Sequence, residues 1–356
     1  YIAAIKYRQS ILEIIKCAFI SNRAAKNGSS VVASNLNIVQ LFKSNFTLNI
    51  AKRDGCIYLI RTKFLNITSS IFSWNEAERR GGVMHLEKGS QIVNLFCMFL
   101  HNRAGESGGV FWVLNADSFY NINSTYVSNL ASYEGGGNFF FELRNLTNIH
   151  STFMNNSAVM KGGAIWIRYL NLFLNKHCSY INNTIFRTSS FQFQVGGAIC
   201  CRYCKFIENH FCMFVNNTAK VKYKGAAAFY ADEVKNIQNV NCLFSNSDTI
   251  SDGQLSVTSG GAFYVKGFWP SGKRINRNFK NIGCVFINSR ALYGGAVFVQ
   301  NIDRFVNVKC IFHKSIGDEG AAFKVEKVNQ VTLLKTIVTS GIAKEFRSQA
   351  QGGAMY

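Results

Sequence analysis

Proline and charged side chains are scarce in this chain. Pro270 is the single proline among 356 residues, and charged residues make up 16% of the sequence. No Pro-, Ser- or charge-rich linker divides the chain, so we expect one continuous architecture over residues 1–356. Lys and Arg number 39 against 19 Asp and Glu, which gives a formal net charge of +20. This excess attracts polyanions such as nucleic acid, anionic polysaccharide or an acidic partner chain.

Long apolar runs and targeting features are also missing. No window reaches the roughly 18 consecutive apolar residues that a membrane-spanning helix needs, and residues 1–6 do not resemble a signal peptide. Residues 352–356 stop inside a repeated motif. We therefore expect a fragment of a longer protein, or a unit that stacks on other units.

Two short motifs alternate along the chain at a regular spacing. In the first, an aromatic residue is followed three positions later by Asn or Ser, as in Phe72/Asn75 and Phe286/Ser289. The second is Gly-Gly-Ala followed by apolar residues, as at 162–167 and 294–299. The second glycine position precedes the next aromatic by 17 residues in nearly every repeat, for example from 82 to 99. Where nothing is inserted, the full period is 26 or 27 residues.

This period predicts an all-β solenoid. Short β-rich runs separated by Gly and Asn, without a helical pattern, are typical of a right-handed parallel β-helix with three short strands per coil and about twelve coils. The aromatic residue and the Cys, Ser or Thr two positions before it share one strand face, which we expect to point inward. The Asn is expected to end the strand in a turn, where its amide can bond its own backbone and neighbouring coils.

The two motifs resemble a known repeat family. Gly-Gly-Ala-Ile, as at 162–165, and Phe-x-x-Asn, as at 153–156, are similar to the repeats of the chlamydial polymorphic outer-membrane proteins. The resemblance extends over nearly the whole chain, although its motifs are short and occur in β-helices of several kinds of organism. It implies a β-helical surface adhesin.

Cysteines follow the repeat. Seven of the 11 lie two positions before the aromatic residue, and neighbouring coils would bring their Cα atoms to about 4.8 Å, within reach of a disulfide. We favour the alternative, a column of small buried thiols that are interchangeable with Ser and Thr at this position. Five of them occupy consecutive coils, namely Cys178, Cys212, Cys242, Cys284 and Cys310. A separate Cys-x-x-Cys at Cys201 and Cys204 could form a local disulfide, and because it is a lone pair we expect no metal site and no cofactor.

An aromatic stripe is the main candidate for a binding surface. The aromatic residue stands three positions after the second glycine, between apolar residues such as Ile165 and Ile167 that would fill the core. We therefore expect the stripe to face outward, beneath a neighbouring rod, another part of the chain or stacked glycan. The alternative is that the stripe itself lies in the core. Its members are Tyr58, Trp112, Phe139, Trp166, Tyr230, Tyr264, Phe298 and Tyr356.

Insertions and glycosylation motifs mark further candidate surfaces. Insertions fall near residues 184–195, 218–224, 248–259, 266–275 and 342–351, mostly at one corner, where they form a recognition ridge or reflect tolerated drift. Asn-x-Ser/Thr motifs indicate a secreted, glycosylated protein. The candidate glycosylation sites are Asn27, Asn45, Asn66, Asn123, Asn145, Asn155, Asn182 and Asn216.

Catalytic patterns are weak. Polysaccharide lyases and hydrolases with this fold need carboxylates at matching register on adjacent coils. Glu87 and Glu142 are at comparable registers but a coil apart, and Asp232 lies between Arg202 and Lys266 as in a surface charge ladder. We therefore do not expect an enzyme, and a polysaccharide-binding or polysaccharide-degrading protein stays the alternative.

These observations favour an extracellular structural or adhesive surface protein that carries N-glycans. We expect it to associate with itself, end to end or laterally, into fibres or arrays, and to bind glycans or anionic polysaccharide. Its basic residues are dispersed along the sequence, so a nucleic-acid partner is not expected. Membrane contact is expected only through a segment outside this sequence.

Overall fold

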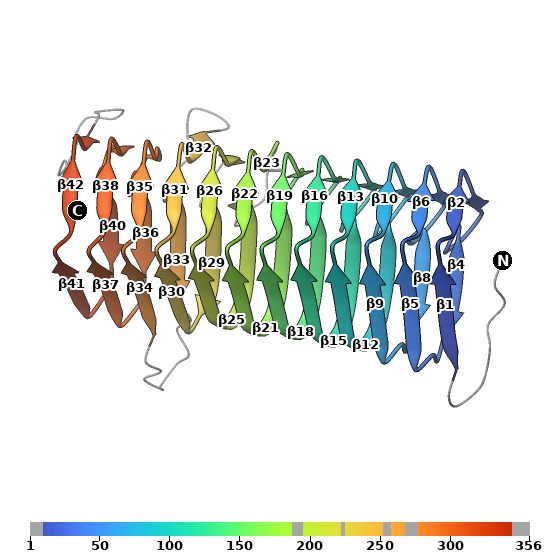
Figure 1. Cartoon of the computed structure of the whole chain (residues 1–356). Coiled ribbons are helices and arrows are strands. Elements are labelled where there is room, and N and C mark those ends of the chain that lie inside the picture. The colour runs from blue at the N-terminus through green and yellow to red at the C-terminus, as the bar shows by residue number, and fades with distance from the viewer. Residues whose placement is uncertain (1–9, 187–194, 222–224, 252–257, 268–276, 344–356) are drawn as a thin grey trace. The chain divides into compact units, whose positions relative to one another are not determined.

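The computed structural model describes residues 10–186, 195–221, 225–251, 258–267 and 277–343. Every regular element in these ranges is a β-strand. The strands stack in parallel into a β-solenoid of about 11 turns (Figure 1). The predicted all-β parallel β-helix is confirmed, whereas the hand of its coil stays a prediction. Across these ranges, no helix has the length and hydropathy to cross a membrane.

The chain comprises two compact units, each described by itself. Unit 1 contains residues 1–159 and 163–170, and unit 2 contains residues 160–162 and 171–356. One strand, β21 Ile165–Lys176, contributes residues to both. That residues 1–356 form one continuous β-helix stays a prediction of the sequence.

Each coil of unit 1 runs through three faces, and the strands of a face lie side by side in Figure 1. The first face contains β1 Ile11–Ile15, β4 Val31–Ser34, β5 Ile38–Phe42, β8 Ile57–Ile60, β9 Phe64–Thr68, β12 Met84–Leu95, β15 Phe111–Ile122 and β18 Asn138–Ile149. The second contains β2 Ala18–Ile20, β6 Asn45–Thr47, β10 Ile71–Ser73, β13 Met98–Leu100, β16 Thr125–Val127 and β19 Thr152–Met154. The third contains β3 Arg23–Ala24, β7 Ile50–Ala51, β11 Glu76–Ala77, β14 Arg103–Ala104, β17 Leu130–Ala131 and β20 Ser157–Ala158.

Unit 2 repeats the same three faces. Its first face contains β25 Ile199–His210, β29 Phe229–Val234, β30 Asn236–Val240, β33 Phe263–Gly267, β34 Asn278–Ile282, β36 Val297–Gln300, β37 Arg304–Val308, β40 Phe323–Glu326 and β41 Gln330–Leu334. The second contains β22 Ser179–Ile181, β26 Met213–Val215, β31 Leu243–Ser245, β35 Val285–Ile287, β38 Ile311–His313 and β42 Ile337–Thr339. Short strands complete the coils, namely β23 Thr184–Ile185, β24 Val195–Gly196, β27 Thr218–Val221, β28 Gly225–Ala226, β32 Asp248–Ser251, β39 Ile316–Gly317 and β43 Ile342–Ala343.

The coils pair in register, so equivalent side chains stack directly. Phe72 pairs with Phe46 in one neighbouring coil and with Phe99 in the other, and its ring lies 5.0 and 5.1 Å from theirs. Unit 2 has an equivalent column, in which Phe214 and Phe244 stack at 4.9 Å. These rings are fully buried. The predicted inward position of the aromatic residue is therefore confirmed.

The Asn three residues after each aromatic lies inside the coil. Asn102 accepts hydrogen bonds at Oδ1 from the backbone N–H and the side-chain amide of Asn75, both at 3.0 Å. Its own amide donates to the Phe72 carbonyl at 2.9 Å and to Asn129 at 3.0 Å. The predicted bonding between coils is confirmed. Asn102 also lies at the end of the strand, in the corner between β13 and β14, and the positive φ of that corner, 53°, is at His101.

Non-glycine residues with positive φ form most of the corners. Such a backbone is costly for a side chain with a Cβ, and it persists here because neighbouring coils hold it. Trp74, with φ of 55°, donates its N–H to the Leu100 carbonyl of the next coil at 3.0 Å. The corner before the first face uses Gly108 and Gly109 instead, since a Cβ on Gly108 would lie 2.2 Å from the Phe111 carbonyl oxygen.

A second buried row of asparagines escaped the sequence analysis. In unit 1 the Asn94 amide donates to Asn121 at 2.9 Å, and the Asn121 amide donates to Asn148 at 2.8 Å. In unit 2 the row continues from Asn209 through Asn239, with a 2.7 Å bond. Each member stands three residues before the Cys or Ser of the repeat. That spacing was a readable signal of a second ladder.

Candidate functional site

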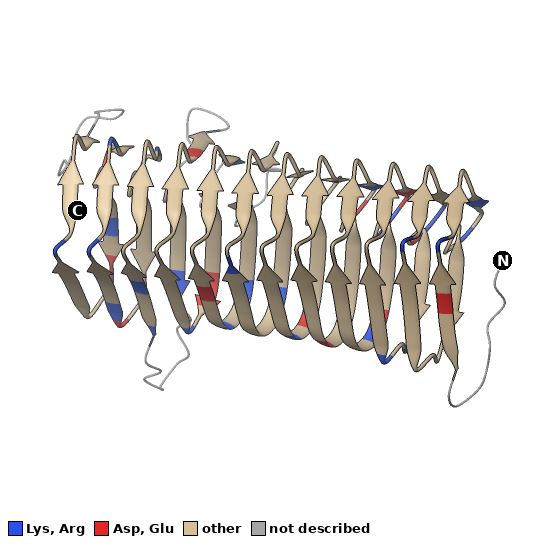
Figure 2. Cartoon of the chain, in the orientation of Figure 1, with Lys and Arg blue, Asp and Glu red and all other residues tan. Residues whose placement is uncertain are grey.

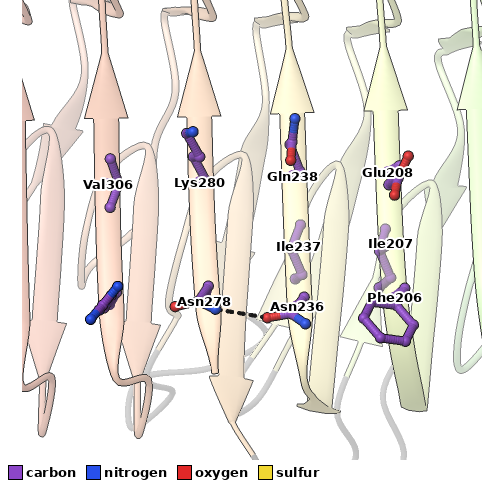
Figure 3. Close-up of a pocket in the computed structure, with 10 residues that line it drawn as sticks. Phe206, Ile207, Glu208, Asn236, Ile237, Gln238, Asn278, Lys280 and Val306 are labelled. Carbon is purple, nitrogen blue, oxygen red and sulfur yellow. Dashed lines mark hydrogen bonds between the residues drawn. The ribbon is translucent and has the colours of Figure 1, made fainter. Parts of the chain in front are cut away.

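A groove of about 470 Å³ is hollowed into the outer face of unit 2 (Figure 3). Strands β25, β30, β34 and β37 form its floor, and each pairs in parallel with the next. Alternate residues of a strand share a face, so the register places two rows of side chains in the groove. One row is Phe206, Asn236, Asn278 and Arg304, and the other is Glu208, Gln238, Lys280 and Val306.

The two ends of the groove differ in chemistry. Phe206 is 36% exposed at one end, with the Lys235 ammonium 5.7 Å from its ring centre. Beside it, Glu208 pairs with His210 at 3.4 Å. At the other end lie Lys280 and Arg304, for which no acidic partner exists within the described ranges.

Amide groups occupy the middle of the groove. The Asn278 amide donates to Asn236 at 3.0 Å, as the dashed line in Figure 3 marks, and Gln238 lies beside them on β30. Amides both donate and accept hydrogen bonds. The groove therefore combines an aromatic face, neutral hydrogen-bonding groups and positive charge. No sequence motif marks the groove, because its residues are spread from 206 to 306.

The aromatic stripe is mostly buried. Its described members Trp112, Phe139, Trp166, Tyr230, Tyr264 and Phe298 are at most 8% exposed, and Tyr58 is half-buried. In unit 1 the rings stack, with Phe139 and Trp166 at 4.5 Å, and in unit 2 Tyr230 and Tyr264 stack at 4.7 Å. Tyr356 lies outside the described residues.

The turn before each strand covers this stripe. The Arg80 guanidinium lies 5.0 Å from the Trp112 ring centre, and a Cβ on Gly196 would lie 3.1 Å from the Cβ of Tyr230. Another part of the same chain therefore covers the stripe, which was one of the three coverings expected. Because the six buried rings leave little surface for a partner, we assign them to packing, which corrects their expected binding role.

His85 interrupts the stripe with a buried polar cluster. Its ring stacks between Tyr58 at 4.8 Å and Trp112 at 4.3 Å. Nε2 lies 2.9 Å from Glu87, and Nδ1 lies 3.7 Å from Asp54. Burial alone would raise the pKa of Asp54, but interaction with His85 and with the nearby arginines holds that pKa below its usual value.

The cysteine column consists of thiols. All 11 cysteines lie in the described ranges, and none of them forms a disulfide. Cys178, Cys212, Cys242, Cys284 and Cys310 are buried in unit 2. A hydrogen bond with Cys178, together with burial, raises the pKa of Cys212 to about 12. Such thiols stay protonated and unreactive at neutral pH.

The Cys-x-x-Cys pair also lies in the core. Cys201 and Cys204 are buried on either side of Tyr203, which forms a corner with φ of 58°. Burial and the neighbouring Cys204 raise the pKa of Cys201 well above its usual value. Among the described residues, no group of three or more His, Cys, Asp or Glu side chains is placed to hold a metal ion.

The charge ladder around Asp232 is buried on one side. Arg202, Asp232 and Lys266 stand at one register on three neighbouring strands, as predicted. Asp232 is fully buried and lies 3.5 Å from the Arg202 guanidinium and 3.6 Å from the Lys266 ammonium. The prediction of a surface ladder is therefore wrong for Asp232, whose buried carboxylate is paired with one cation on each neighbouring strand.

The compared carboxylates do not share a register. Glu87 pairs with Leu114, which pairs with Phe141, so Glu142 lies one position further along, at a corner with φ of 57°. Glu142 lines a second hollow, of about 540 Å³, in unit 1. Asp117 in that hollow forms an ion pair with Arg144 at 3.3 Å. The expectation of comparable registers was wrong because it took no account of the corner residue.

Charge is spread thinly over both units. In Figure 2 most of the ribbon is tan, and the Lys, Arg, Asp and Glu positions are scattered along it. Of the predicted insertions, residues 187–194, 222–224, 252–257, 268–275 and 344–351 lie outside the described residues. The remaining parts of those insertions include β23, β27 and β32, which extend the third face.

Most candidate glycosylation sites are exposed. Asn45, Asn66, Asn123, Asn155, Asn182 and Asn216 are exposed, whereas Asn27 and Asn145 are half-buried. Asn45 accepts a 2.7 Å hydrogen bond from the Thr47 hydroxyl of its own motif. Asn216 accepts one of 2.9 Å from Asn246 in the next coil.

One repeat has the complete pattern of both motifs. It runs through β19 and β20, passes the glycine corner and enters β21. Residues 150–168 match the Chlamydia polymorphic membrane protein repeat. This repeat match confirms the predicted resemblance, and the parallel β-solenoid is consistent with it. No curated protein and no solved structure matches the chain.

The repeat match indicates the class of protein. It favours a surface or adhesin-like β-helix protein over an enzyme, and it favours an outer-membrane or surface location. The match covers residues 150–168 alone. The finer aspects of function therefore rest on the geometry of this chain.

Proposed function

We propose that this protein is an extracellular structural or adhesive rod that carries N-glycans and associates with itself. The observation that carries the proposal is the parallel β-solenoid, in which a segment matches the Chlamydia polymorphic membrane protein repeat. A solenoid repeats one surface many times and so presents extended faces to partners.

Exposed motifs support the N-glycans. Asn45 and Asn66 are exposed on β6 and β9, so their side chains are accessible for modification in the folded chain. Peptide mapping of protein from its native source, with and without glycosidase, tests this proposal. We expect modification at exposed sites such as Asn45 and Asn66 and none at half-buried Asn27 and Asn145. Unmodified asparagines throughout would refute it.

An apolar patch on unit 1 supports lateral self-association. Leu48, Ile71, Trp74, Phe96 and Met98 are between 41% and 56% exposed. Ile71 and Met98 pair in register, and the Leu48 N–H bonds to Ser73, next to Trp74. Contiguous exposed apolar surface of this kind marks interaction sites.

Sedimentation velocity tests the association. We expect assemblies of the wild-type chain to be weakened by Trp74→Asn, because Asn tolerates the positive φ of this corner. Tyr133→Asn is the matched control, since Tyr133 is 51% exposed elsewhere on unit 1. A monomeric wild-type chain at all concentrations, or equal effects of the two variants, would contradict the lateral model.

A further inference from the structure

The groove of unit 2 has features that packing does not explain. Its floor spans three strand spacings, about 14 Å at roughly 4.8 Å each, and its side chains project outward from paired strands. The row that begins at Phe206 passes through two amides to Arg304, and the row that begins at Glu208 passes through Gln238 and Lys280 to Val306. Figure 3 shows the amides between the two ends. A ligand that fits must therefore be elongated and chemically graded in the same way.

The basic end requires an anionic group. Lys280 and Arg304 stand on the adjacent strands β34 and β37, two residues apart in register, because Arg304 pairs with Asn278 and Lys280 pairs with Val306. Neither side chain has an acidic partner within the described part of the chain, although unit 2 pairs other cations closely, as in Arg277 with Asp303 at 3.2 Å. Charge-assisted hydrogen bonds from such cations to carboxylate or sulfate are strong and directional.

The other end requires a polar molecule with an apolar face. Phe206 presents ring surface beside Glu208, and the amides of Asn236, Gln238 and Asn278 follow toward the cations. A sugar ring offers C–H groups on its face and hydroxyls on its edge, so an aromatic ring next to amides and a carboxylate suits it. A nucleic acid would meet one aromatic ring here and three cations, Lys235, Lys280 and Arg304. That is fewer contacts than a strand with a phosphate on every nucleotide uses.

We propose that this groove binds an acidic oligosaccharide whose carboxylate or sulfate groups contact Lys280 and Arg304 while a sugar ring packs on Phe206. The inference rests on the proposed adhesive function and supplies its ligand class. Glu208 accepts hydrogen bonds from the hydroxyls between the two ends, and the Asn236 and Gln238 amides both accept from them and donate to them. Glu208 also repels anionic groups at the Phe206 end, which fixes the direction of the bound chain.

Titration calorimetry with defined sugars tests the proposal. The probes are a heparin hexasaccharide, a hyaluronan hexasaccharide and the neutral chitohexaose. We expect at least one of the acidic probes to bind and chitohexaose to bind about tenfold more weakly or not at all, because it lacks the charge-assisted contacts. A preference for heparin over hyaluronan identifies sulfate, and the reverse preference identifies carboxylate. Equal binding of all three probes would overturn the acidic class.

Three variants locate the site. Lys280→Gln and Phe206→Ser should each weaken binding of the preferred probe about tenfold or more, whereas Lys280→Arg should retain it. Lys220→Gln is the matched control, because Lys220 is an exposed lysine on β27 outside the groove and the net charge changes equally. An equal loss in Lys220→Gln would show non-specific attraction and sink the assignment. Since these side chains line a solvent-filled groove, unchanged circular dichroism is expected for all variants.

Failure of this inference is separable from failure of the proposed function. If no acidic probe binds while native protein is found glycosylated at the cell surface, the groove assignment falls and the surface function stands. If a single-stranded oligonucleotide binds more tightly than the sugars and Phe206→Ser weakens it equally, the ligand class is wrong and nucleic acid replaces it.

Discussion

The buried asparagine ladder should be a main source of stability, and Asn102→Ala tests it. In the wild-type chain the Asn102 Oδ1 atom accepts from both the backbone N–H and the side-chain amide of Asn75. The substitution removes this acceptor inside a core where both residues are fully buried. Two donors are left unpaired, and a buried unpaired donor costs about 1–3 kcal/mol, so we expect a loss of roughly 2–6 kcal/mol.

Urea denaturation followed by circular dichroism measures the total loss of stability. Asn66→Ala is the control, because Asn66 is exposed on β9 and surface substitutions usually change stability by no more than about 0.5 kcal/mol. Repeat proteins can unfold in parts, so hydrogen exchange at the Asn75 amide supplies a local measure. That amide should exchange much faster in Asn102→Ala. A loss below about 1 kcal/mol with the Asn75 amide still protected would refute the reasoning.

Three further predictions concern the core. First, at pH 8 a thiol reagent should modify Cys17 quickly, because Cys17 is exposed and the other ten cysteines are buried. All 11 thiols should react once the protein is denatured. Fewer than 11 reactive thiols in the denatured protein would reveal disulfides. Second, the hydrogen bond with Cys178, together with burial, raises the pKa of the Cys212 thiol from 9.0 to about 12. Folding therefore favours the protonated thiol, and stability should fall as the pH rises above about 9. Each such thiol contributes about 1.4 kcal/mol per pH unit, and Cys212→Ala should lessen the slope measured by denaturation at pH 8 to 10.5. Third, Ser247→Asn should raise stability by about 1 kcal/mol, because the Ser247 hydroxyl occupies the ladder position without a hydrogen-bond partner in the described chain; an unchanged melting temperature would contradict this.

The sequence predicted those features that depend on spacing alone. The aromatic column follows from a period that returns Phe72 and Phe99 to one register. The corners did not follow, because Trp74 and His101 adopt positive φ only when the next coil accepts their N–H groups. No property of Trp or His by itself indicates such a backbone.

Features that depend on the third dimension were predicted less well. The outward direction of the stripe was one of two alternatives, but its burial required a turn that folds back over the strand, as Arg80 does over Trp112. The groove gathers Phe206 and Arg304 from strands that are far apart in sequence. Its residues follow no repeated motif, so periodicity could not reveal them.

In-register stacking has a consequence for how this protein can change over time. Each coil of unit 1 pairs with the next in the same register, as Phe72 does with Phe99 and Phe99 with Tyr126. A gene that loses or duplicates one whole repeat therefore still encodes coils that match their neighbours. The molecule can therefore change length in whole coils while its interior stays compatible. Outward positions, free of that constraint, can diverge from copy to copy, and a family of such proteins could vary what it displays without redesigning what holds it together.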